Sequence, residues 1–184
     1  MPRPKQLSDE ALLEAAMPAI FGKAPGEMTL AEVGKAVGLS PATLLQRFGS
    51  KQQLVVAALA LANEKNFAAL DRLPPERGSE AVIRIFVDRT PGPEHEGLLG
   101  DQLLWLRASM ADPHINLLSR DYFERFRKAI AERLPPLSMA ADDAVLLVEA
   151  QWHGALTQWG IDRKGHLRDY VEARMRALFE ALGA

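Results

Sequence analysis

The side chains best suited to recognise another molecule lie in one short segment, residues 41–48, with the sequence PATLLQRF. Drawn as a helix, this segment has apolar side chains on one side, including Leu44 and Phe48, and small or polar side chains on the other. The small or polar side chains are Ala42, Thr43, Gln46 and Arg47. Hydroxyl, amide and guanidinium groups on an exposed helix face can form hydrogen bonds with base edges in the major groove of DNA. The segment therefore indicates non-covalent recognition.

Covalent or metal-assisted chemistry has no comparable pattern in this chain. There is no cysteine, which excludes disulfides, thiolate nucleophiles and cysteine-based zinc sites. No histidine follows a glutamate by three residues, as di-iron helical bundles require, although Glu149 lies four residues before His153. The glycine-rich phosphate, dinucleotide and nucleophile-elbow motifs are also absent from the sequence. We therefore predict a protein that is not an enzyme and that has no cofactor and no metal site.

Two short helices joined by a glycine turn are expected to position the polar face. Thr29 can cap the first helix, with Glu32 completing a capping box, and Gly38 suits the left-handed position that ends it. Ser40 can cap the second helix, and Pro41 fits its first turn. Such a pair with a polar second helix is typical of the helix-turn-helix, whose second helix enters the major groove of DNA. A plain helical hairpin inside a core fits the same pattern.

This stretch resembles the DNA-binding domain of the tetracycline-repressor (TetR) family of bacterial regulators. The residues in register with the family pattern are Gly38, Leu39, Ser40, Thr43, Leu44, Phe48, Ser50, Lys51 and Leu54. The chain departs from the pattern at Leu45, where the family usually has a phosphate-contacting tyrosine, and at Gln52, which is usually acidic. The resemblance is specific over residues 8–59 and depends beyond them on the number and order of helices.

The apolar pattern of the whole chain predicts an all-α fold of about nine helices, with an N-terminal three-helix head and a C-terminal helical bundle. The expected helices are 7–22, 30–37, 41–48, 51–73, 80–89, 95–111, 113–134, 140–159 and 166–182. We expect residues 1–54 to form the helix-turn-helix DNA-binding domain and residues 55–184 to form a helical ligand-binding and dimerisation domain. The helix at 51–73 would link the two.

The helix-turn-helix residues have specific expected roles at the DNA. Base readout would fall to Ala42 on a thymine methyl group, Gln46 on an adenine edge and Arg47 on a guanine or a phosphate. The predicted DNA-binding set is completed by residues at helix starts: Thr29, Ser40, Pro41, Thr43 and Lys51. The N-terminal tail adds Arg3 and Lys5, which could reach a groove or the phosphate backbone.

Net charge gives no independent support for DNA binding. The chain carries a formal charge of −2, and residues 1–51 hold six basic against five acidic side chains, a difference of only +1. Many DNA-binding domains are clearly basic. The prediction therefore depends on where Arg47 and Lys51 are placed and not on the total charge.

The resemblance implies a small-molecule pocket in the middle of the chain and a homodimer formed by the last two helices. The candidate ligand-binding residues are Leu103, Trp105, Leu106, Met110, His114, Phe123, Phe126, Trp152 and His153. The candidate dimer residues lie on apolar stripes of the last two helices: Val145, Val148, Trp152, Ala155, Trp159, Val171, Met175, Leu178 and Leu182. Every member of both sets could instead be ordinary core, because a stripe at helical spacing is typical of both.

The function expected from these features is a ligand-responsive transcriptional regulator, most simply a repressor. It would bind a palindromic operator as a homodimer and be released by a small apolar or amphipathic effector. The sequence has no apolar run near the roughly 18 residues that cross a membrane, and no signal-peptide core, so a cytoplasmic protein is expected. The alternative is a helical small-molecule-binding or protein-interaction module without sequence-specific DNA binding, suggested by Leu45.

Overall fold

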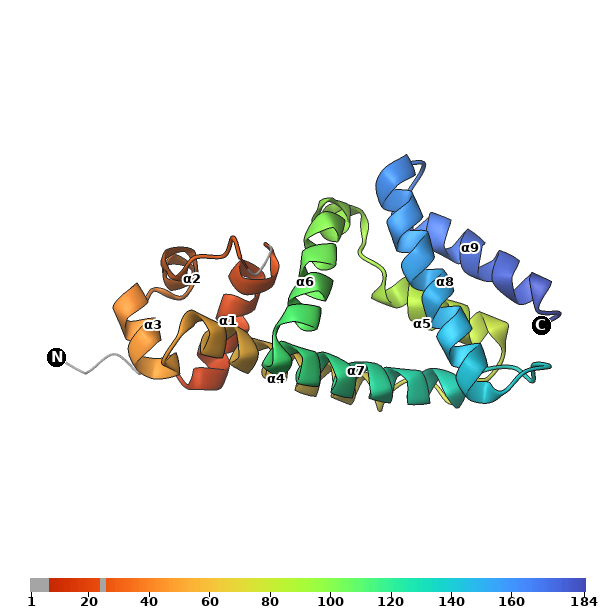
Figure 1. The fold of residues 1–184 in the computed structure, drawn as a ribbon, viewed down its shortest axis with the longest axis horizontal. Helices are drawn as coiled ribbons and strands as arrows, with labels where there is room; N and C mark the ends of the chain where they lie inside the picture. The colour runs from red at the N-terminus through yellow and green to blue at the C-terminus, as the bar shows by residue number, and fades with distance from the viewer. Residues whose placement is uncertain (1–6, 24–25) are drawn as a thin grey trace. The chain divides into compact units, whose positions relative to one another are not determined.

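The computed structural model describes residues 7–23 and 26–184, apart from the side chains of residues 97, 98, 101 and 102. Arg3 and Lys5 lie outside the described residues. Over the described ranges the chain forms nine α-helices and one 3₁₀ helix, with no strand, so the all-α prediction is confirmed (Figure 1). The elements are α1 (Asp9–Phe21), α2 (Leu30–Val37), α3 (Pro41–Phe48), α4 (Lys51–Leu70), α5 (Ser79–Arg89), η1 (Pro93–Leu98), α6 (Leu99–Ala111), α7 (Pro113–Ala131), α8 (Ala141–Asp162) and α9 (Leu167–Ala181).

Helix starts follow the capping residues of the sequence. The Ser8 hydroxyl oxygen accepts a hydrogen bond from the Ala11 N–H at 3.2 Å and caps α1. Asp112 Oδ1 accepts hydrogen bonds from the N–H groups of His114 and Ile115, at 2.9 and 3.2 Å, at the start of α7. Each carboxyl or hydroxyl oxygen satisfies a main-chain donor that has no acceptor inside the helix.

Several helix ends differ from the expected boundaries. α4 ends at Leu70 and α7 at Ala131, each three residues early, because Leu73 and Leu134 directly precede proline pairs. The residue before a proline is disfavoured in the helical conformation. The helix expected at 95–111 was wrong as a single element: a 3₁₀ turn starting at Pro93 comes first, and α6 begins only at Leu99.

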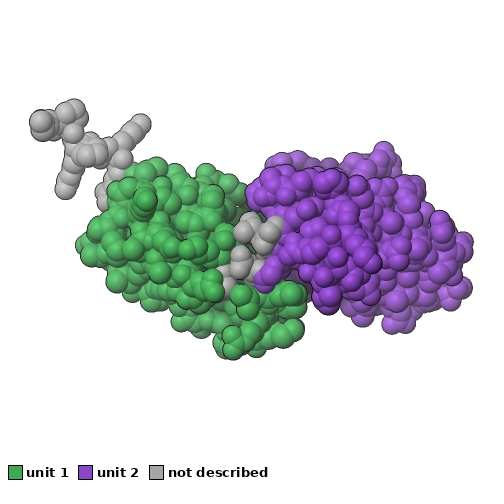
Figure 2. Space-filling model, turned by 90° about the horizontal axis from the view of Figure 1, so that it is seen from above, with its two compact units in different colours: residues 1–68, 101–122 green, residues 69–100, 123–184 purple. Residues whose placement is uncertain are grey.

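The chain divides into two compact units (Figure 2). Unit 1 comprises Met1–Ala68 and Asp101–Tyr122, and unit 2 comprises Ala69–Gly100 and Phe123–Ala184. The three N-terminal helices therefore share a unit with most of α6 and the first half of α7. The functional division at residues 54 and 55 remains a prediction, since compactness does not report function.

The core of unit 1 lies among α1, α2, α3, α4 and the start of α7. Its fully enclosed side chains include Leu12, Ile20, Val33, Leu44 and Leu54, with Ile115 of α7 at 5% exposure in the same cluster. Removing this apolar surface from water stabilises the unit by about 1.5–3 kcal/mol for each large side chain. A three-helix head is thereby extended into a larger core.

The core of unit 2 is built from α5, α8 and α9 with the second half of α7. Phe86 and Phe126 meet edge to face with ring centroids 5.3 Å apart. The buried carboxylate of Glu149 accepts hydrogen bonds from Arg127 at 2.6 and 3.2 Å. The indole N–H of Trp152 donates to the Thr90 hydroxyl oxygen at 3.0 Å. Buried polar groups are thus paired, as a stable interior requires.

Candidate nucleic-acid interface

The start of α2 is fixed by the expected capping box. Thr29 Oγ1 accepts a hydrogen bond from the Glu32 N–H at 3.2 Å, and Glu32 Oε2 accepts one from the Thr29 N–H at 3.1 Å. Glu32 also forms an exposed ion pair with Lys23, with Nζ and Oε1 2.6 Å apart. Hydrogen bonds from Lys23 and Thr29 lower the pKa of Glu32 to about 2, and the contact raises the pKa of Lys23. Both side chains are therefore charged at neutral pH.

The turn between α2 and α3 depends on two glycines. Gly38 ends α2 in the left-handed conformation with φ of 70°, as expected from sequence. Gly34, inside α2, is buried, and a Cβ atom there would lie 2.3 Å from the main-chain oxygen of Leu39. Since main chain cannot yield as a flexible side chain can, only glycine allows α2 and the turn to approach this closely.

The recognition helix α3 begins at its predicted cap and rests on apolar side chains. The N–H of Thr43 donates to the Ser40 hydroxyl oxygen at 3.1 Å, and Pro41 occupies the first helical turn. Leu44, 1% exposed, packs into the unit 1 core beside Val33. This seating fixes which side of α3 faces away from the protein.

The exposed side of α3 carries Ala42, Leu45 and Gln46, and Thr43 is half-buried. Leu45 is 42% exposed, which is unusual for a large apolar side chain, and it lies beside two potential base contacts. The sequence prediction had left Leu45 out of the recognition face. Its spacing of three residues from Ala42 on a short helix would have placed it there.

Arg47 does not face outward as expected. Its side chain is only 18% exposed and forms an ion pair with Asp9 at the start of α1, with Nε and Oδ1 2.8 Å apart. Its Nη2 atom also donates to the main-chain oxygen of Leu7 at 2.8 Å. Three residues separate Arg47 from the buried Leu44, so helical spacing brings it back toward the protein. Arg47 therefore joins α3 to α1.

Lys51 begins α4, directly after the turn that ends α3. Its side chain is half-buried, and its Nζ atom lies 3.4 Å from the main-chain oxygen of Gly26, a weak contact that leaves the ammonium group available. The Gln53 N–H donates to the Ser50 hydroxyl oxygen at 3.0 Å, which satisfies one donor at this helix start.

The nine residues proposed for ligand binding divide between the two units. Those from Leu103 to His114 belong to unit 1, and those from Phe123 to His153 belong to unit 2. Trp105 is a structural part of unit 1: its indole N–H donates to the Lys23 main-chain oxygen at 3.0 Å, and its ring lies 5.1 Å from that of Phe21. None of the nine lines the unit 1 cavity around Lys51 and Ile115 or the unit 2 cavity around Arg77 and Ala144.

Within unit 2, the proposed ligand residues form an aromatic group. Trp152 lies 4.8 Å from His153 and 6.5 Å from Phe126, measured between ring centroids, and His153 lies 6.0 Å from Phe123. Phe126 is 1% exposed and belongs to the core. Phe123, Trp152 and His153 are half-buried, so these three retain accessible ring surface.

The stripes predicted to form the dimer interface are instead core. The enclosed side chains are Val145, Val148, Ala155, Trp159, Val171 and Met175, none of which exceeds 4% exposure. A side chain surrounded by its own chain cannot contact a second copy. The remaining three, Trp152, Leu178 and Leu182, are half-buried. Helical spacing alone could not distinguish a stripe facing the core from one facing a partner.

The sequence and the fold can both be compared with those of known proteins. Residues 12–58 match the family model described as "Bacterial regulatory proteins, tetR family". No curated protein matches the chain.

Among solved structures, a transcriptional regulator from Rhodococcus sp. Rha1 has 15% identity and a TM-score of 0.74, with 97% of this chain and 99% of that one covered. A regulator from Saccharomonospora viridis in complex with choline has 21% identity and a TM-score of 0.69, covering 92% and 93%. A TetR-family regulator from Rhodococcus sp. has 15% identity and a TM-score of 0.70, covering 96% and 98%.

At these identities the solved structures share the fold. The family model covers the part of unit 1 that contains α2, α3 and most of α1. Residues 12–58 therefore belong to the DNA-binding domain of the TetR family of bacterial regulatory proteins, and nearly the whole chain shares its fold with solved transcriptional regulators.

Proposed function

We propose that the protein is a ligand-responsive transcriptional repressor that binds a palindromic operator as a homodimer and is released by a small effector. The observation that carries the proposal is that α3 turns its polar side away from the protein. Ser40 caps this helix, Leu44 anchors it, and Gln46 is exposed on its far side. A short, rigidly seated helix with a polar outer face can enter the major groove without rearrangement.

Base readout in this proposal falls to the exposed side of α3. Gln46 would pair with an adenine edge, and Ala42 would approach a thymine methyl group. Leu45 takes the place of the tyrosine that the family usually directs at a phosphate, so one hydrogen bond to the backbone would be replaced by an apolar contact. Arg47 would act mainly by orienting α3, because reading a guanine would require it to leave Asp9 and Leu7.

Contacts to the phosphate backbone would come from the edges of the motif. Thr29, Ser40, Pro41 and Thr43 lie at the starts of α2 and α3, where main-chain N–H groups attract anions. Lys51 adds a positive charge at the start of α4. Such contacts fix the orientation of the protein on the duplex without reading sequence.

The dimer would form through surfaces of α8 and α9 that the core does not use. On α8, Leu146 and Ile161 are 50% and 79% exposed, and Ala150 and Thr157 continue the same helical stripe between them. On α9, a row of small residues at a spacing of four is exposed: Ala173, Ala177 and Ala181. Small side chains allow two helices to approach closely, and a two-fold interface would present two recognition helices to successive turns of DNA.

The effector would be a small apolar or amphipathic molecule. Phe123, Trp152 and His153 supply half-buried ring surface in unit 2. The regulator from Saccharomonospora viridis is solved with choline, and aromatic faces attract such cations. Effector binding would shift the population of conformers away from the one that binds DNA.

Selection of bound sequences from random duplex DNA, using the full chain, tests the proposal. The expected product is one palindromic sequence whose half-sites lie one helical turn apart, or a multiple of it. Recovery of unrelated sequences, with binding abolished by moderate salt, would contradict operator recognition. It would favour the alternative of a small-molecule-binding or protein-interaction module, in which exposed Leu45 meets another protein.

A further inference from the structure

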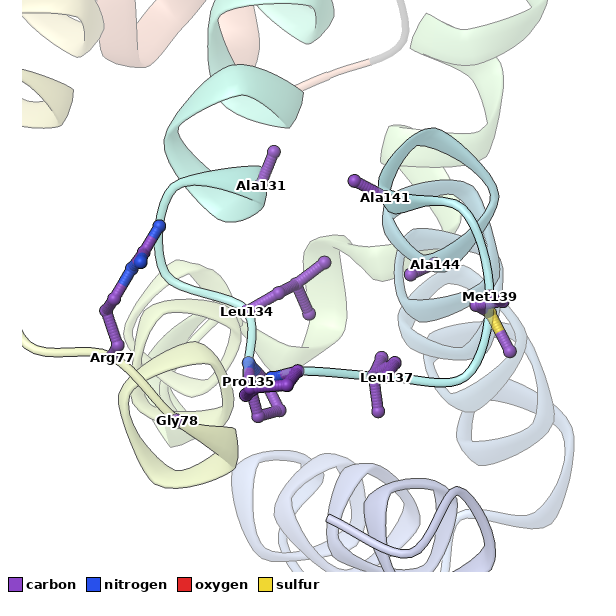
Figure 3. Close-up of a pocket in the computed structure, with 10 residues that line it drawn as sticks. Arg77, Gly78, Ala131, Leu134, Pro135, Leu137, Met139, Ala141 and Ala144 are labelled. Atoms are coloured by element: carbon purple, nitrogen blue, oxygen red, sulfur yellow. The ribbon is translucent and has the colours of Figure 1, made fainter.

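Unit 2 contains a cavity of about 550 Å³ at the end of α7, away from the aromatic group described above (Figure 3). The loop between α7 and α8 curves around it, and Arg77 and Met139 lie on opposite sides. Leu134, Leu137 and the starts of α5 and α8 complete the lining. The volume lies within the range of about 300–1,000 Å³ that small-molecule sites usually have.

A buried arginine links two of the segments that line the cavity. Arg133, 9% exposed, donates hydrogen bonds to the main-chain oxygens of Leu73, Pro74 and Ala129 at 3.0, 2.8 and 2.8 Å. The Gly78 N–H donates in turn to the Arg133 main-chain oxygen at 2.9 Å. These bonds tie the segment before α5 to the end of α7. Arg77 and Leu134, which line the cavity, lie on these two segments.

The loop that borders the cavity is restricted by its prolines, and the α8 side carries small side chains. Two successive prolines, Pro135 and Pro136, follow Leu134 and restrict the main chain. On the α8 side the lining residues are Ala141 and Ala144, whose side chains end at one methyl group. Apolar surface and small side chains therefore leave room for an apolar molecule.

Arg77 supplies one positive charge at the wall. Its Nε atom donates to the Glu132 main-chain oxygen at 2.6 Å, which fixes the guanidinium group. No hydrogen bond from its two terminal nitrogens is described among the residues that the structure covers. A guanidinium with two free terminal groups presents the paired donors that a carboxylate accepts.

The surrounding charges favour a single negative group. Within the described part of the chain, no carboxylate is among the lining residues, while Asp142 and Asp143 follow Ala141 in the first turn of α8. One carboxylate can balance the charge of Arg77, and the lining residues offer no second cation for another negative group. The site thus combines an apolar body with one cationic group, as amphipathic ligands require.

We propose that this cavity binds a small aliphatic monocarboxylate, with its carboxylate on Arg77 and its chain against Leu134, Leu137 and Met139. The proposal concerns unit 2 alone and stands whether or not the protein binds DNA. It adds a second ligand site to the one assigned to the aromatic group.

Isothermal titration calorimetry of the full chain with sodium octanoate tests it. Saturable binding of one octanoate per chain is expected, and Arg77→Ala should weaken it at least tenfold. Octan-1-ol, which lacks the charge, should bind the wild type more weakly than octanoate and should not distinguish wild type from Arg77→Ala. Arg84→Ala is the matched control, because Arg84 lies on α5, pairs with Glu76 at 2.6 Å and does not line the cavity.

A filling variant separates this site from any other. Ala141 is exposed at the first position of α8, so Ala141→Phe should block the cavity without disturbing the core, and thermal unfolding should match wild type. Octanoate binding should then be lost. The proposal is overturned if wild type shows no saturable octanoate binding, if Arg77→Ala or Ala141→Phe leaves it unchanged, or if octan-1-ol binds as tightly as octanoate.

Discussion

The α2–α3 segment and the α8–α9 pair contain the same kind of apolar pattern, yet their structures were predictable to different degrees. In α2–α3, capping residues and a left-handed glycine fix each boundary, and the positions of Thr29, Gly38 and Ser40 follow from their residue types. In α8–α9, apolar stripes fix only the helices. A local cap has one structural meaning, whereas a stripe can face its own core or a partner.

The largest expected effect tests the assignment of the α9 stripe to the core. Met175 is fully enclosed, so Met175→Ala should lower the free energy of unfolding by about 3 kcal/mol through lost burial and a new cavity. Urea unfolding at two protein concentrations measures this loss.

Leu146→Asp is the contrasting change: it should leave the chain folded but yield monomers in analytical ultracentrifugation. Two results together would contradict these assignments: a Met175→Ala variant that is as stable as wild type but monomeric, and a Leu146→Asp variant that is still a dimer.

Gly34 provides the corresponding test in α2–α3. Gly34→Ala should cost about 2 kcal/mol of unfolding free energy, because the added methyl group overlaps the Leu39 main-chain oxygen. Gly154, inside α8, is the control: no described atom lies within 4 Å of the Cβ it would gain, so Gly154→Ala should be neutral or stabilising by up to about 1 kcal/mol. Equal effects of the two changes in urea unfolding would contradict the close approach at Gly34.

Arg47 can be tested through its partner. If Arg47 orients α3, Asp9→Asn and Arg47→Ala should both weaken operator binding alike across sequence variants, and each should cost about 1 kcal/mol or less of stability. If Arg47 reads a guanine, Asp9→Asn would free it and strengthen binding, whereas Arg47→Ala would relax specificity at one base pair. Fluorescence anisotropy with a panel of single-base operator variants separates these outcomes.

Acid should weaken unit 2 through Glu149. Burial alone would raise the pKa of this carboxyl, but the nearby His153, with Nε2 and Oε1 3.7 Å apart, and the hydrogen bonds from Arg127 outweigh it and lower the pKa below the ordinary value of 4.5. A lowered pKa contributes stability above pH 4.5 that is lost as the pH falls through the folded value. The loss of unfolding free energy between pH 7 and acidic pH should therefore be smaller in Glu149→Gln. Identical losses in both proteins would exclude Glu149 as a source.

The Lys51→Ala variant should show the smallest change in DNA affinity. Its effect distinguishes contacts to the phosphate backbone from base readout. Removing one phosphate contact with Lys51→Ala should reduce the slope of log affinity against log salt by about one unit and weaken all sequences equally. Lys35→Ala is a suitable control, since Lys35 is exposed on α2 outside the proposed contact set. A slope unchanged by Lys51→Ala would remove Lys51 from the interface.

What the sequence could predict depended on how far apart the interacting residues lie. The Thr29 and Ser40 caps involve partners within three residues, and both were predicted from residue types. Arg47 was misplaced because its partner Asp9 lies 38 residues earlier in the chain. No rule of helical spacing reveals such a pair.

The sequence also could not predict which unit a residue belongs to. Trp105 looked like a pocket residue on an apolar helix, but its bond to Lys23 spans 82 residues and makes it part of unit 1. Similarly, the cavity beside Arg77 is formed by two segments, residues 77–78 and 131–144, that meet only in the fold. Each of these features depends on tertiary contacts that residue types and spacing leave open.

The most direct test of α3 as the recognition helix uses Gln46, its exposed polar residue. Affinities of wild type and Gln46→Ala should be compared on the selected operator and on duplexes in which each base pair is changed in turn. We expect Gln46→Ala to lose about 1–3 kcal/mol of discrimination at a single base pair of each half-site and to keep the rest of the profile. A Gln46→Ala profile identical to that of wild type at every position would contradict base readout by this face.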